Sequence, residues 1–297
     1  MVLIAKKKEK WIAAGKCYAP WYDEGETYLE EGAHVPLLRF RASRGQSWMQ
    51  LAFSTRLGGV SKKEELSTLN LGWDRGEPAE NVCENYRRVC RQLGADYRQL
   101  VLSDQVHGTT VQYVGREQTG GEKIEKKLSG VDGLITDVPG LILATSYADC
   151  VPLFFFDPVR HIIASSHSGW KGTVSMIGQK TVEQMQERGC RPGDIIAVIG
   201  PSICQECYEV GGDVAERFYD AYPVQHYEQI LTKKEGGKYQ LDLWAANWLQ
   251  LKKAGIAPEH IHLSGICTCC NHKLLFSHRA TNGRRGNLNG FMMINVP

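Results

Sequence analysis

Residues 149–173, DCVPLFFFDPVRHIIASSHSGWKGT, decide how the centre of this chain folds. Two apolar runs are separated by DPVR, residues 157–160, a turn composition with proline at its second position. The runs are therefore predicted to form an antiparallel hairpin in which Phe156 faces His161. In that register Cys150 lies directly opposite His167 on one face of the sheet, with Cβ atoms roughly 4.5–5.5 Å apart.

This pair of side chains has two chemical interpretations and one structural one. A thiolate and an imidazole at that separation can share a metal ion or form a Cys–His catalytic dyad. The structural alternative is a buried thiol near a hydrogen-bonded histidine, and the pair alone does not decide between them. The loop that follows, SGWKGT, leads into a predicted helix, where free N–H groups and Lys171 favour a phosphate or carboxylate beside the pair.

Further segments of the chain indicate the fold class. Residues 79–95 show helical periodicity, with Val82, Tyr86 and Val89 on one face, and helices are also expected over 173–189 and 242–255. The mixture of hairpin-spaced strands and intervening helices predicts an α/β fold, a single domain of layered mixed β-sheets flanked by helices. Residues 115–129 are expected to form a surface loop. The expected strands are residues 48–55, 110–114, 140–147, 151–156, 161–166, 195–200, 261–266 and 291–296.

Composition limits the class of protein and its partners. The 297 residues, 42% hydrophobic and 23% charged, are enough for one large domain. A net charge of +2 gives no large field of one sign, which argues against nucleic-acid binding. The longest uncharged run, residues 138–148, is shorter than the roughly 20 residues that cross a bilayer, and the N-terminal residues lack a secretory pattern. We expect a cytoplasmic protein with no membrane partner.

The ten cysteines are expected to be free thiols or metal ligands, as in a reducing compartment. CQEC at residues 204–207 and CTCC at residues 267–270 resemble two halves of a four-thiolate zinc site. This interpretation is the less favoured one, because CTCC has the wrong spacing and a second Cys-x-x-Cys pair is taken to be missing. Cys17, Cys83, Cys90 and Cys190 have no partner pattern and are expected to be small packing residues.

Six segments occur in an order that resembles one protein family, which includes bacterial YfiH and YlmD and mammalian laccase domain-containing proteins. Its members have been described as polyphenol oxidases, peptidoglycan editing factors and purine nucleoside phosphorylases. The resemblance implies a YfiH-like α/β catalytic domain over residues 51–297, with residues 1–50 as an N-terminal extension packed on it. The segments are FSTRLGGVS (53–61), SDQVHGTTV (103–111), ADCVPLFFFDP (148–158), HSGWKGT (167–173), GPSICQECYEVG (200–211) and CTCCNHKLLFSHR (267–279).

The resemblance also implies a metal site. Two histidines and one cysteine bind the metal in this family, usually zinc, and they match His107, Cys150 and His167. Three protein ligands with an open fourth position are typical of a catalytic zinc. The chain departs from the family pattern at Cys204, where glycine is more frequent, and in FSHRATNGRRG, residues 276–286, so the substrate pocket is less well defined than the metal site.

The implied activity is phosphorolysis of purine nucleosides such as adenosine, inosine and methylthioadenosine, with adenosine deamination as a related reaction. Zinc would activate water for deamination or orient phosphate or substrate. In this hypothesis Asp149 acts as acid or base, with a hydrogen-bonding role as its alternative. Arg56, Lys171 and Arg279 would hold phosphate, Trp170 would stack on the purine or serve packing, and Gln105 would contact substrate.

Three alternatives stay open at the level of sequence. Two histidines and a cysteine are also the ligands of blue-copper sites, so copper-dependent phenol oxidation is the second hypothesis. Against it, the chain has 9 histidines and one His-x-His pair, at His260 and His262, whereas multicopper oxidases need many such pairs. The third is a metal-independent Cys–His hydrolase acting in peptidoglycan editing. The non-enzyme alternative is a zinc-stabilised binding module, which would have four protein ligands and no open position on the metal. The sequence does not predict the oligomeric state.

Overall fold

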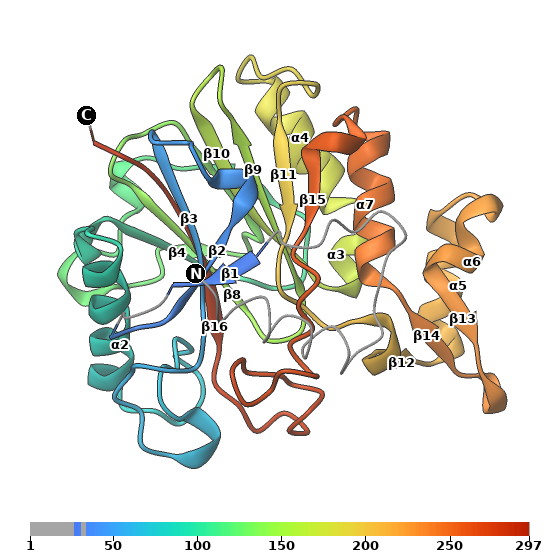
Figure 1. Ribbon diagram of the computed structural model, residues 1–297, viewed down its shortest axis with the longest axis horizontal. Helices are drawn as coiled ribbons and strands as arrows, with labels where there is room; N and C mark the ends of the chain where they lie inside the picture. The colour runs from blue at the N-terminus through green and yellow to red at the C-terminus, as the bar shows by residue number, and fades with distance from the viewer. Residues whose placement is uncertain (1–26, 31–33, 297) are drawn as a thin grey trace.

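Two mixed β-sheets lie face to face in the middle of the computed structural model, which describes residues 27–30 and 34–296 (Figure 1). Parallel and antiparallel pairs occur in both sheets, which makes each of them mixed. The first sheet has seven strands in the order β1 (Thr27–Leu29), β2 (Leu37–Phe40), β3 (Met49–Ser54), β16 (Leu288–Ile294), β8 (Ile142–Tyr147), β4 (Leu100–Asp104) and β6 (Leu128–Ser129). The second has six, in the order β15 (Ile261–Leu263), β11 (Ile196–Ile199), β9 (Val151–Asp157), β10 (Ile162–Ser168), β7 (Gly133–Thr136) and β5 (Val111–Tyr113).

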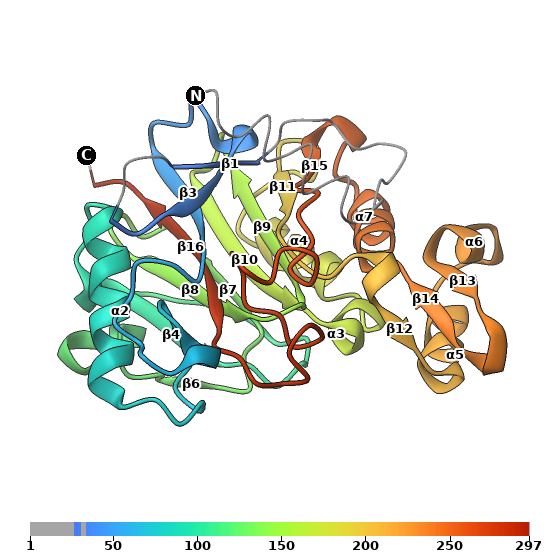
Figure 2. The ribbon, with the colours of Figure 1, turned by 60° about the horizontal axis from the view of Figure 1, so that its bottom comes forward.

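Helices cover the outer faces of both sheets (Figures 1 and 2). Helix α2 (Ala79–Gln92) packs on the seven-stranded sheet, and α3 (Trp170–Val174), α4 (Ile177–Gln186) and α7 (Leu243–Lys253) pack on the six-stranded sheet. A small third sheet of β12 (Glu209–Val210), β14 (Tyr239–Leu241) and β13 (Leu231–Lys233) lies beside α5 (Gly212–Ala221) and α6 (Tyr227–Ile230). Short 3-10 helices span Arg41–Ser43, Glu64–Leu66, Tyr97–Gln99, Arg116–Gln118, Gly121–Lys123, Gln205–Cys207, Val224–His226, Glu235–Gly237 and Pro258–His260.

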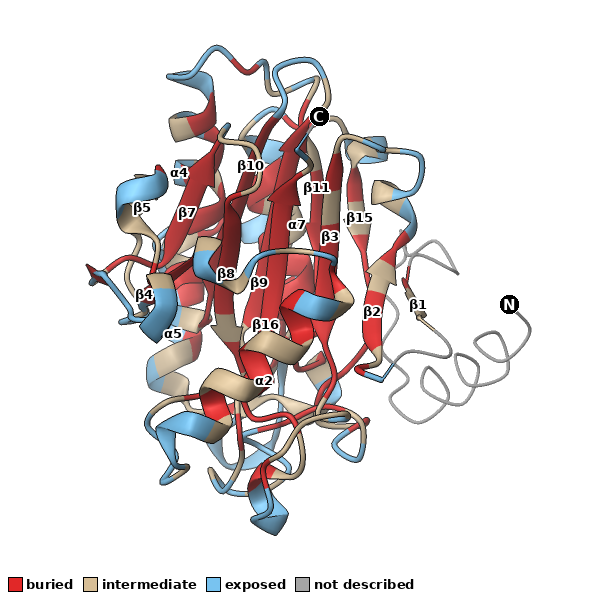
Figure 3. Ribbon diagram, turned by 90° about the vertical axis from the view of Figure 1, so that its left-hand side faces the viewer, coloured by how far each residue is buried: buried red, intermediate tan, exposed pale blue. Residues whose placement is uncertain are grey.

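The central strands are buried on both faces, as Figure 3 shows. Phe154 and Phe156 point from β9 toward the seven-stranded sheet and join the cluster that contains Phe53 and Met292. Phe155, between them, belongs to the cluster under α4 and α7. Because successive side chains of a strand alternate, a continuous apolar run such as VPLFFF fits a strand with a core on each side. The predicted α/β fold of layered mixed sheets is confirmed.

The predicted hairpin forms from β9 and β10, but the predicted register is wrong by two positions. His167 pairs with Pro152 rather than with Cys150, and Phe156 pairs with Ile163 rather than with His161. A shift by two preserves the face of each side chain, so Cys150 and His167 remain on one side. They are diagonal neighbours rather than direct partners.

The connection between β9 and β10 explains this difference. Asp157 Oδ1 accepts hydrogen bonds from the backbone N–H groups of Val159, at 2.8 Å, and Arg160, at 2.9 Å. The Asp157 carbonyl accepts from the His161 N–H at 2.8 Å, and His161 has a left-handed φ of 52°. The turn therefore includes His161, which the prediction had placed in the strand.

The three predicted helices are present, with one interruption. The segment predicted as one helix over residues 173–189 is divided into α3 and α4 at Met176, whose φ is 60°. Residues 115–129 lie mostly at the surface as expected, but Gly115, Gly120, Ile124 and Leu128 are buried. The segment also contains two 3-10 helices and ends in β6. The hydrophobic periodicity of the sequence did not predict α5. It did not predict the small third sheet either, because the strands of that sheet have only two or three residues each.

Residues before the motif match contribute to the first sheet. Strands β1 and β2 pair with each other, and β2 pairs with β3, so part of the predicted N-terminal extension continues the sheet. The rest of that prediction, together with Cys17, lies outside the described residues, and the boundary at residue 50 stays a prediction. Within the described ranges, no helix is both long and apolar enough to span a bilayer.

Candidate active site

His107, Cys150 and His167 converge although they come from three separate segments. Their ligand atoms all lie within 4.8 Å of one another, and the two imidazole rings meet edge to face at a centroid distance of 4.8 Å. His107 follows β4, Cys150 directly precedes β9, and His167 lies on β10. Gly169 leaves room for them, since a Cβ atom there would lie 3.0 Å from the His107 ring and 3.1 Å from Cys150 Sγ.

Asp132, which the sequence analysis did not identify, holds two of these residues in place. Its carboxylate lies 2.9 Å from His167 Nδ1. The same carboxylate accepts hydrogen bonds from the backbone N–H groups of Val106, His107 and Gly108, at 2.8 to 3.1 Å. The loop carrying His107, which has a left-handed φ of 61°, is thereby tied to His167.

The electrostatics of the pair favour a thiolate and a charged imidazole. Burial by itself raises the pKa of Cys150, but the neighbouring His167 and His107 outweigh it and bring that pKa down to about 6. Burial lowers the pKa of His167, but Cys150 and Asp132 outweigh it and raise that pKa to about 9. For Asp132 too, burial raises the pKa, and the bonds from His167 and from backbone N–H groups lower it below its usual value.

The donor set fits a bound metal ion. Imidazole nitrogen and thiolate sulfur are ligands of both zinc and copper. Because Asp132 engages Nδ1 of His167, the Nε2 atom is the one left for a metal, and such a carboxylate–histidine contact is typical of metal sites. His167 is 4% exposed and Cys150 half-buried, whereas His107 is exposed, so the group is open on one side.

That open side faces a cavity of about 470 Å³. All three ligand residues line it, and so do four of the predicted site residues: Gln105, Asp149, Trp170 and Arg279. Several other lining residues that bear charge or an aromatic ring were not predicted from the sequence. These are Asp74, Arg75, Asp104, Lys126, Tyr147, Tyr208, His278 and Arg285, and Lys126 pairs with Asp104 at 3.7 Å.

The cavity is rich in cations. Burial and the neighbouring Arg75 lower the pKa of Arg285 to about 10, which leaves it charged at neutral pH. Arg75 and Arg285 both hydrogen bond to the Asn287 side chain, and Arg285 Nε is buried without a partner. In the part of the chain that the structure describes, the ion pairs involve none of Arg75, Arg279 and Arg285. These side chains favour an anionic ligand.

Two lining residues use their polar atoms within the protein. Asp149 has a left-handed φ of 86° and accepts from Thr268 Oγ1 at 2.6 Å and from the Arg279 backbone N–H at 2.7 Å. Its geometry favours the hydrogen-bonding role over that of acid or base. Gln105 donates to the Ser146 carbonyl at 2.9 Å and accepts from the Ser146 N–H at 2.7 Å, so it joins the segment after β4 to the end of β8.

Arg56 and Lys171 do not line the cavity. The Arg56 guanidinium donates to three backbone carbonyls, those of Ser67, His272 and Glu64, and lies 4.6 Å from the centre of the Phe276 ring. It therefore joins loops instead of presenting free donors to a phosphate. Lys171 is exposed, with Nζ 5.7 Å from the Trp170 ring.

The chain is similar to known proteins over most of its length. The family model described as multi-copper polyphenol oxidoreductase laccase matches residues 50–295. Purine nucleoside phosphorylase YlmD of Bacillus subtilis (strain 168) is 38% identical over 245 residues, or 81% of this chain and 86% of that protein. Adenosine deaminase RL5, from an unknown prokaryotic organism, is 36% identical over 230 residues, 77% of this chain and 87% of that protein. The crystal structure of YlmD from Geobacillus stearothermophilus superimposes with a TM-score of 0.84 at 31% identity, covering 91% of this chain and 99% of that one.

Proposed function

The chain belongs to the family described as multi-copper polyphenol oxidoreductase laccase, and we propose that it is a zinc-dependent purine nucleoside phosphorylase that also deaminates adenosine. The names of its relatives, a purine nucleoside phosphorylase and an adenosine deaminase, support an enzyme of this type. One observation carries the proposal: the group of His107, Cys150 and His167 opens onto a cavity lined by arginines.

The three ligand residues would hold the metal. A bound zinc ion supplies Lewis-acid chemistry that side chains lack. Asp132 fixes the ring of His167 with Nε2 toward Cys150 and, through its bonds to the backbone, fixes the loop of His107. The fourth position then stays available for substrate.

Phosphate would bind to the cavity cations. Arg75, Arg279 and Arg285 replace Arg56 and Lys171 as the residues that we assign to this role, because they line the cavity. Arginine binds phosphate oxygens in pairs, and a partly buried arginine without a carboxylate partner gains most from an anion. Asp149 positions Arg279 through the backbone bond at 2.7 Å.

The nucleoside would occupy the same cavity beside the metal. Trp170 and Tyr208 supply aromatic surface for a purine ring, and the volume of about 470 Å³ lies in the range of small-molecule sites. In phosphorolysis a phosphate oxygen forms a bond to C1′ of the ribose and the C1′–N9 bond breaks. The purine leaves with that electron pair and takes up a proton, so the products are ribose 1-phosphate and free base.

The test is a nucleoside panel with zinc-loaded protein. Inosine, adenosine and methylthioadenosine are incubated with and without inorganic phosphate, and the products are separated by chromatography. We expect free base and the sugar 1-phosphate only when phosphate is present, and inosine from adenosine without it. Free ribose formed without phosphate would instead identify a hydrolase.

Copper-dependent phenol oxidation is the second candidate, favoured by the donor set of two imidazoles and one thiolate. Within the described residues, the only other candidate metal group consists of four cysteines, so one histidine-containing group is present where a multicopper enzyme needs several. Oxygen uptake with a phenol by copper-loaded protein, without nucleoside turnover by zinc-loaded protein, would favour this candidate over the phosphorylase.

A further inference from the structure

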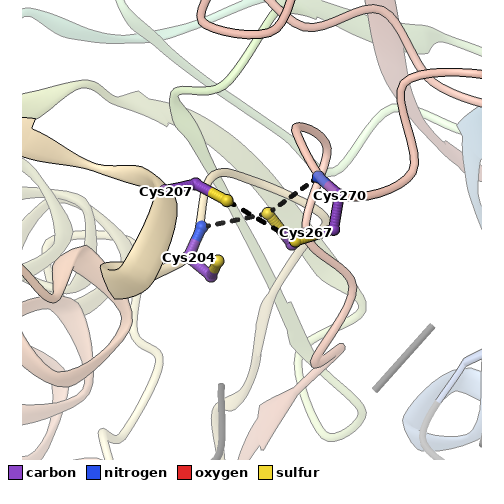
Figure 4. Close-up of side chains that lie close together, drawn as sticks. All are labelled: Cys204, Cys207, Cys267 and Cys270. Atoms are coloured by element: carbon purple, nitrogen blue, oxygen red, sulfur yellow. Dashed lines mark hydrogen bonds between the residues drawn. The ribbon is translucent and has the colours of Figure 1, made fainter. Parts of the chain in front are cut away.

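Four cysteines from two distant loops meet at a second place in the molecule, shown in Figure 4. Cys204 and Cys207 follow β11, and Cys267 and Cys270 follow β15. Their sulfur atoms all lie within 4.8 Å of one another, and those of Cys207 and Cys270 are 3.5 Å apart. The convergence follows from the fold, because β11 and β15 are adjacent parallel strands whose ends reach the same edge of the sheet.

The spacing in both loops is that of metal ligands. Cys204 and Cys207 form a Cys-x-x-Cys pair, and so do Cys267 and Cys270, with Cys269 inside the second pair. The four-thiolate site was disfavoured from the sequence because CTCC has the wrong spacing and a second Cys-x-x-Cys pair was taken to be missing. The structure overturns that objection, since Cys269 is not part of the four-residue group.

We propose that Cys204, Cys207, Cys267 and Cys270 form a structural zinc site. A tetrahedral zinc ion with bonds of about 2.3 Å places its sulfur ligands about 3.8 Å apart. The separations of up to 4.8 Å are close to this value, so small side-chain rotations complete the site. Four thiolates without an open position are typical of structural rather than catalytic zinc.

The surroundings of Cys267 also suit a thiolate ligand. Its sulfur accepts N–H groups from Cys204 and from Cys270, each at 3.4 Å (Figure 4). Hydrogen bonds from backbone N–H groups stabilise the negative charge of a metal-bound thiolate. Cys204 and Cys267 are buried and Cys207 and Cys270 half-buried, which leaves a path for the ion to enter.

The zinc would hold together the two loops that form one wall of the cavity. Thr268, next to Cys267, donates to the Asp149 carboxylate at 2.6 Å, and the N–H of Ile203, next to Cys204, donates to the Asp149 carbonyl at 3.0 Å. Ile203 and Tyr208 themselves line the cavity. The site thus fixes the peptide that precedes Cys150 without taking part in the reaction.

Metal analysis of the whole protein tests the proposal. Protein from zinc-supplemented culture, purified without chelators, should contain about two zinc ions per chain. The half-buried ligands are the best positions for substitution, and Cys207→Ser and Cys270→Ser should each lose about one zinc and melt at a lower temperature. Cys269→Ser, in the same loop, is the matched control and should keep both ions, whereas His107→Ala should lose only the ion of the cavity.

Wild-type protein gives an answer even where a variant fails to fold. An organomercurial titration with a colorimetric zinc indicator should release one zinc as these four cysteines react, separately from the ion held by Cys150. Peptide mapping should show the four cysteines shielded from alkylation until then. A wild-type zinc content that His107→Ala removes completely would overturn the proposal. A Cys207–Cys270 disulfide in a non-reducing peptide map would also overturn it, and iron in the same four thiolates would overturn the assignment to zinc.

Discussion

Asp132 determines the geometry of the metal ligands although it is not a ligand itself. Its carboxylate accepts hydrogen bonds from three backbone N–H groups and contacts Nδ1 of His167, so both carboxylate oxygens have hydrogen-bond partners. Such a carboxylate sets the tautomer and orientation of the metal-binding histidine. The sequence analysis missed it because its contact with His167 arises from the pairing of β7 with β10, which no local pattern of residues reveals.

Asp132→Asn should weaken zinc binding at the cavity by roughly 10- to 100-fold. Asparagine keeps the shape, but its amide group replaces one acceptor oxygen with a donor that faces N–H groups. Zinc affinity is measured by competition with a chromogenic chelator. Asp137→Asn is the control, because Asp137 bonds the exposed Tyr113 hydroxyl and no ligand residue. Equal affinity in wild type and Asp132→Asn would show that the carboxylate does not position His167.

Cys150 distinguishes the zinc hypothesis from the Cys–His hydrolase hypothesis. As a ligand its thiolate should be shielded from iodoacetamide in zinc-loaded protein and should react once zinc is chelated. Cys150→Ser should lower zinc content and nucleoside phosphorolysis in parallel. Labelling at Cys150 is followed by mass spectrometry with and without chelator. Equally fast labelling of fully loaded protein in both conditions would remove Cys150 from the ligand set.

For the secondary-structure elements, the sequence predicted correctly which face of the sheet a side chain occupies, but not the register in which the strands pair. Cys150 and His167 were expected on one face of the hairpin, and they are, because a shift by two residues leaves the alternation unchanged. The register itself depends on Asp157, which extends the turn to His161 through its side chain and carbonyl. Composition indicates that a turn exists, whereas its length depends on these hydrogen bonds.

The N-terminal cap of helix α7 can be tested by substitution of a single residue. Asp242 caps it by accepting the Ala245 N–H at 2.9 Å, and burial raises the pKa of Asp242 to about 6. Asp242→Ala should be about 1 kcal/mol less stable to unfolding than Asp242→Asn, because both remove the carboxylate and only asparagine keeps an acceptor. Thermal melts at several pH values measure this difference in stability and also show how protonation of Asp242 changes the stability of the wild-type protein.

The direction of the pH effect follows from the raised pKa. Folded protein binds the Asp242 proton more tightly than unfolded protein, where the pKa is about 3.9. The contribution of Asp242 to the free energy of unfolding is therefore largest below about pH 4 and falls as the pH rises to about 6 and beyond. Asp242→Asn should lack this decline. An identical pH profile in wild type and variant would show that the pKa of Asp242 is not raised in the folded protein.

At the scale of the whole molecule, the cavity is built from segments that lie far apart in the chain. Arg75 lies in the connection before α2, whereas Arg279 and Arg285 lie in the connection before β16. The two connections are joined at Asn287, whose carbonyl accepts from the Leu71 N–H at 3.1 Å and whose side chain accepts from Arg75. From the sequence, phosphate was assigned to Arg56, Lys171 and Arg279, and of these only Arg279 lines the cavity. Which cation faces a cavity depends on how distant loops pack, and that information is absent from local motifs.

Phosphate should therefore stabilise the whole protein, and the effect distinguishes the two sets of arginines. A ligand that binds only the folded state raises the melting temperature by mass action. Inorganic phosphate should raise the melting temperature of wild-type protein more than chloride at equal ionic strength. In Arg285→Met this increase should disappear, since Arg285 lines the cavity with a buried and unpartnered Nε. Arg56→Met should instead melt at a lower temperature without phosphate, because three carbonyls lose their donor, and should keep the increase. Differential scanning calorimetry across a phosphate series makes the measurement. If the phosphate-dependent increase in melting temperature persists in Arg285→Met and vanishes in Arg56→Met, phosphate binds at Arg56, as the sequence motif predicted, and not at Arg285.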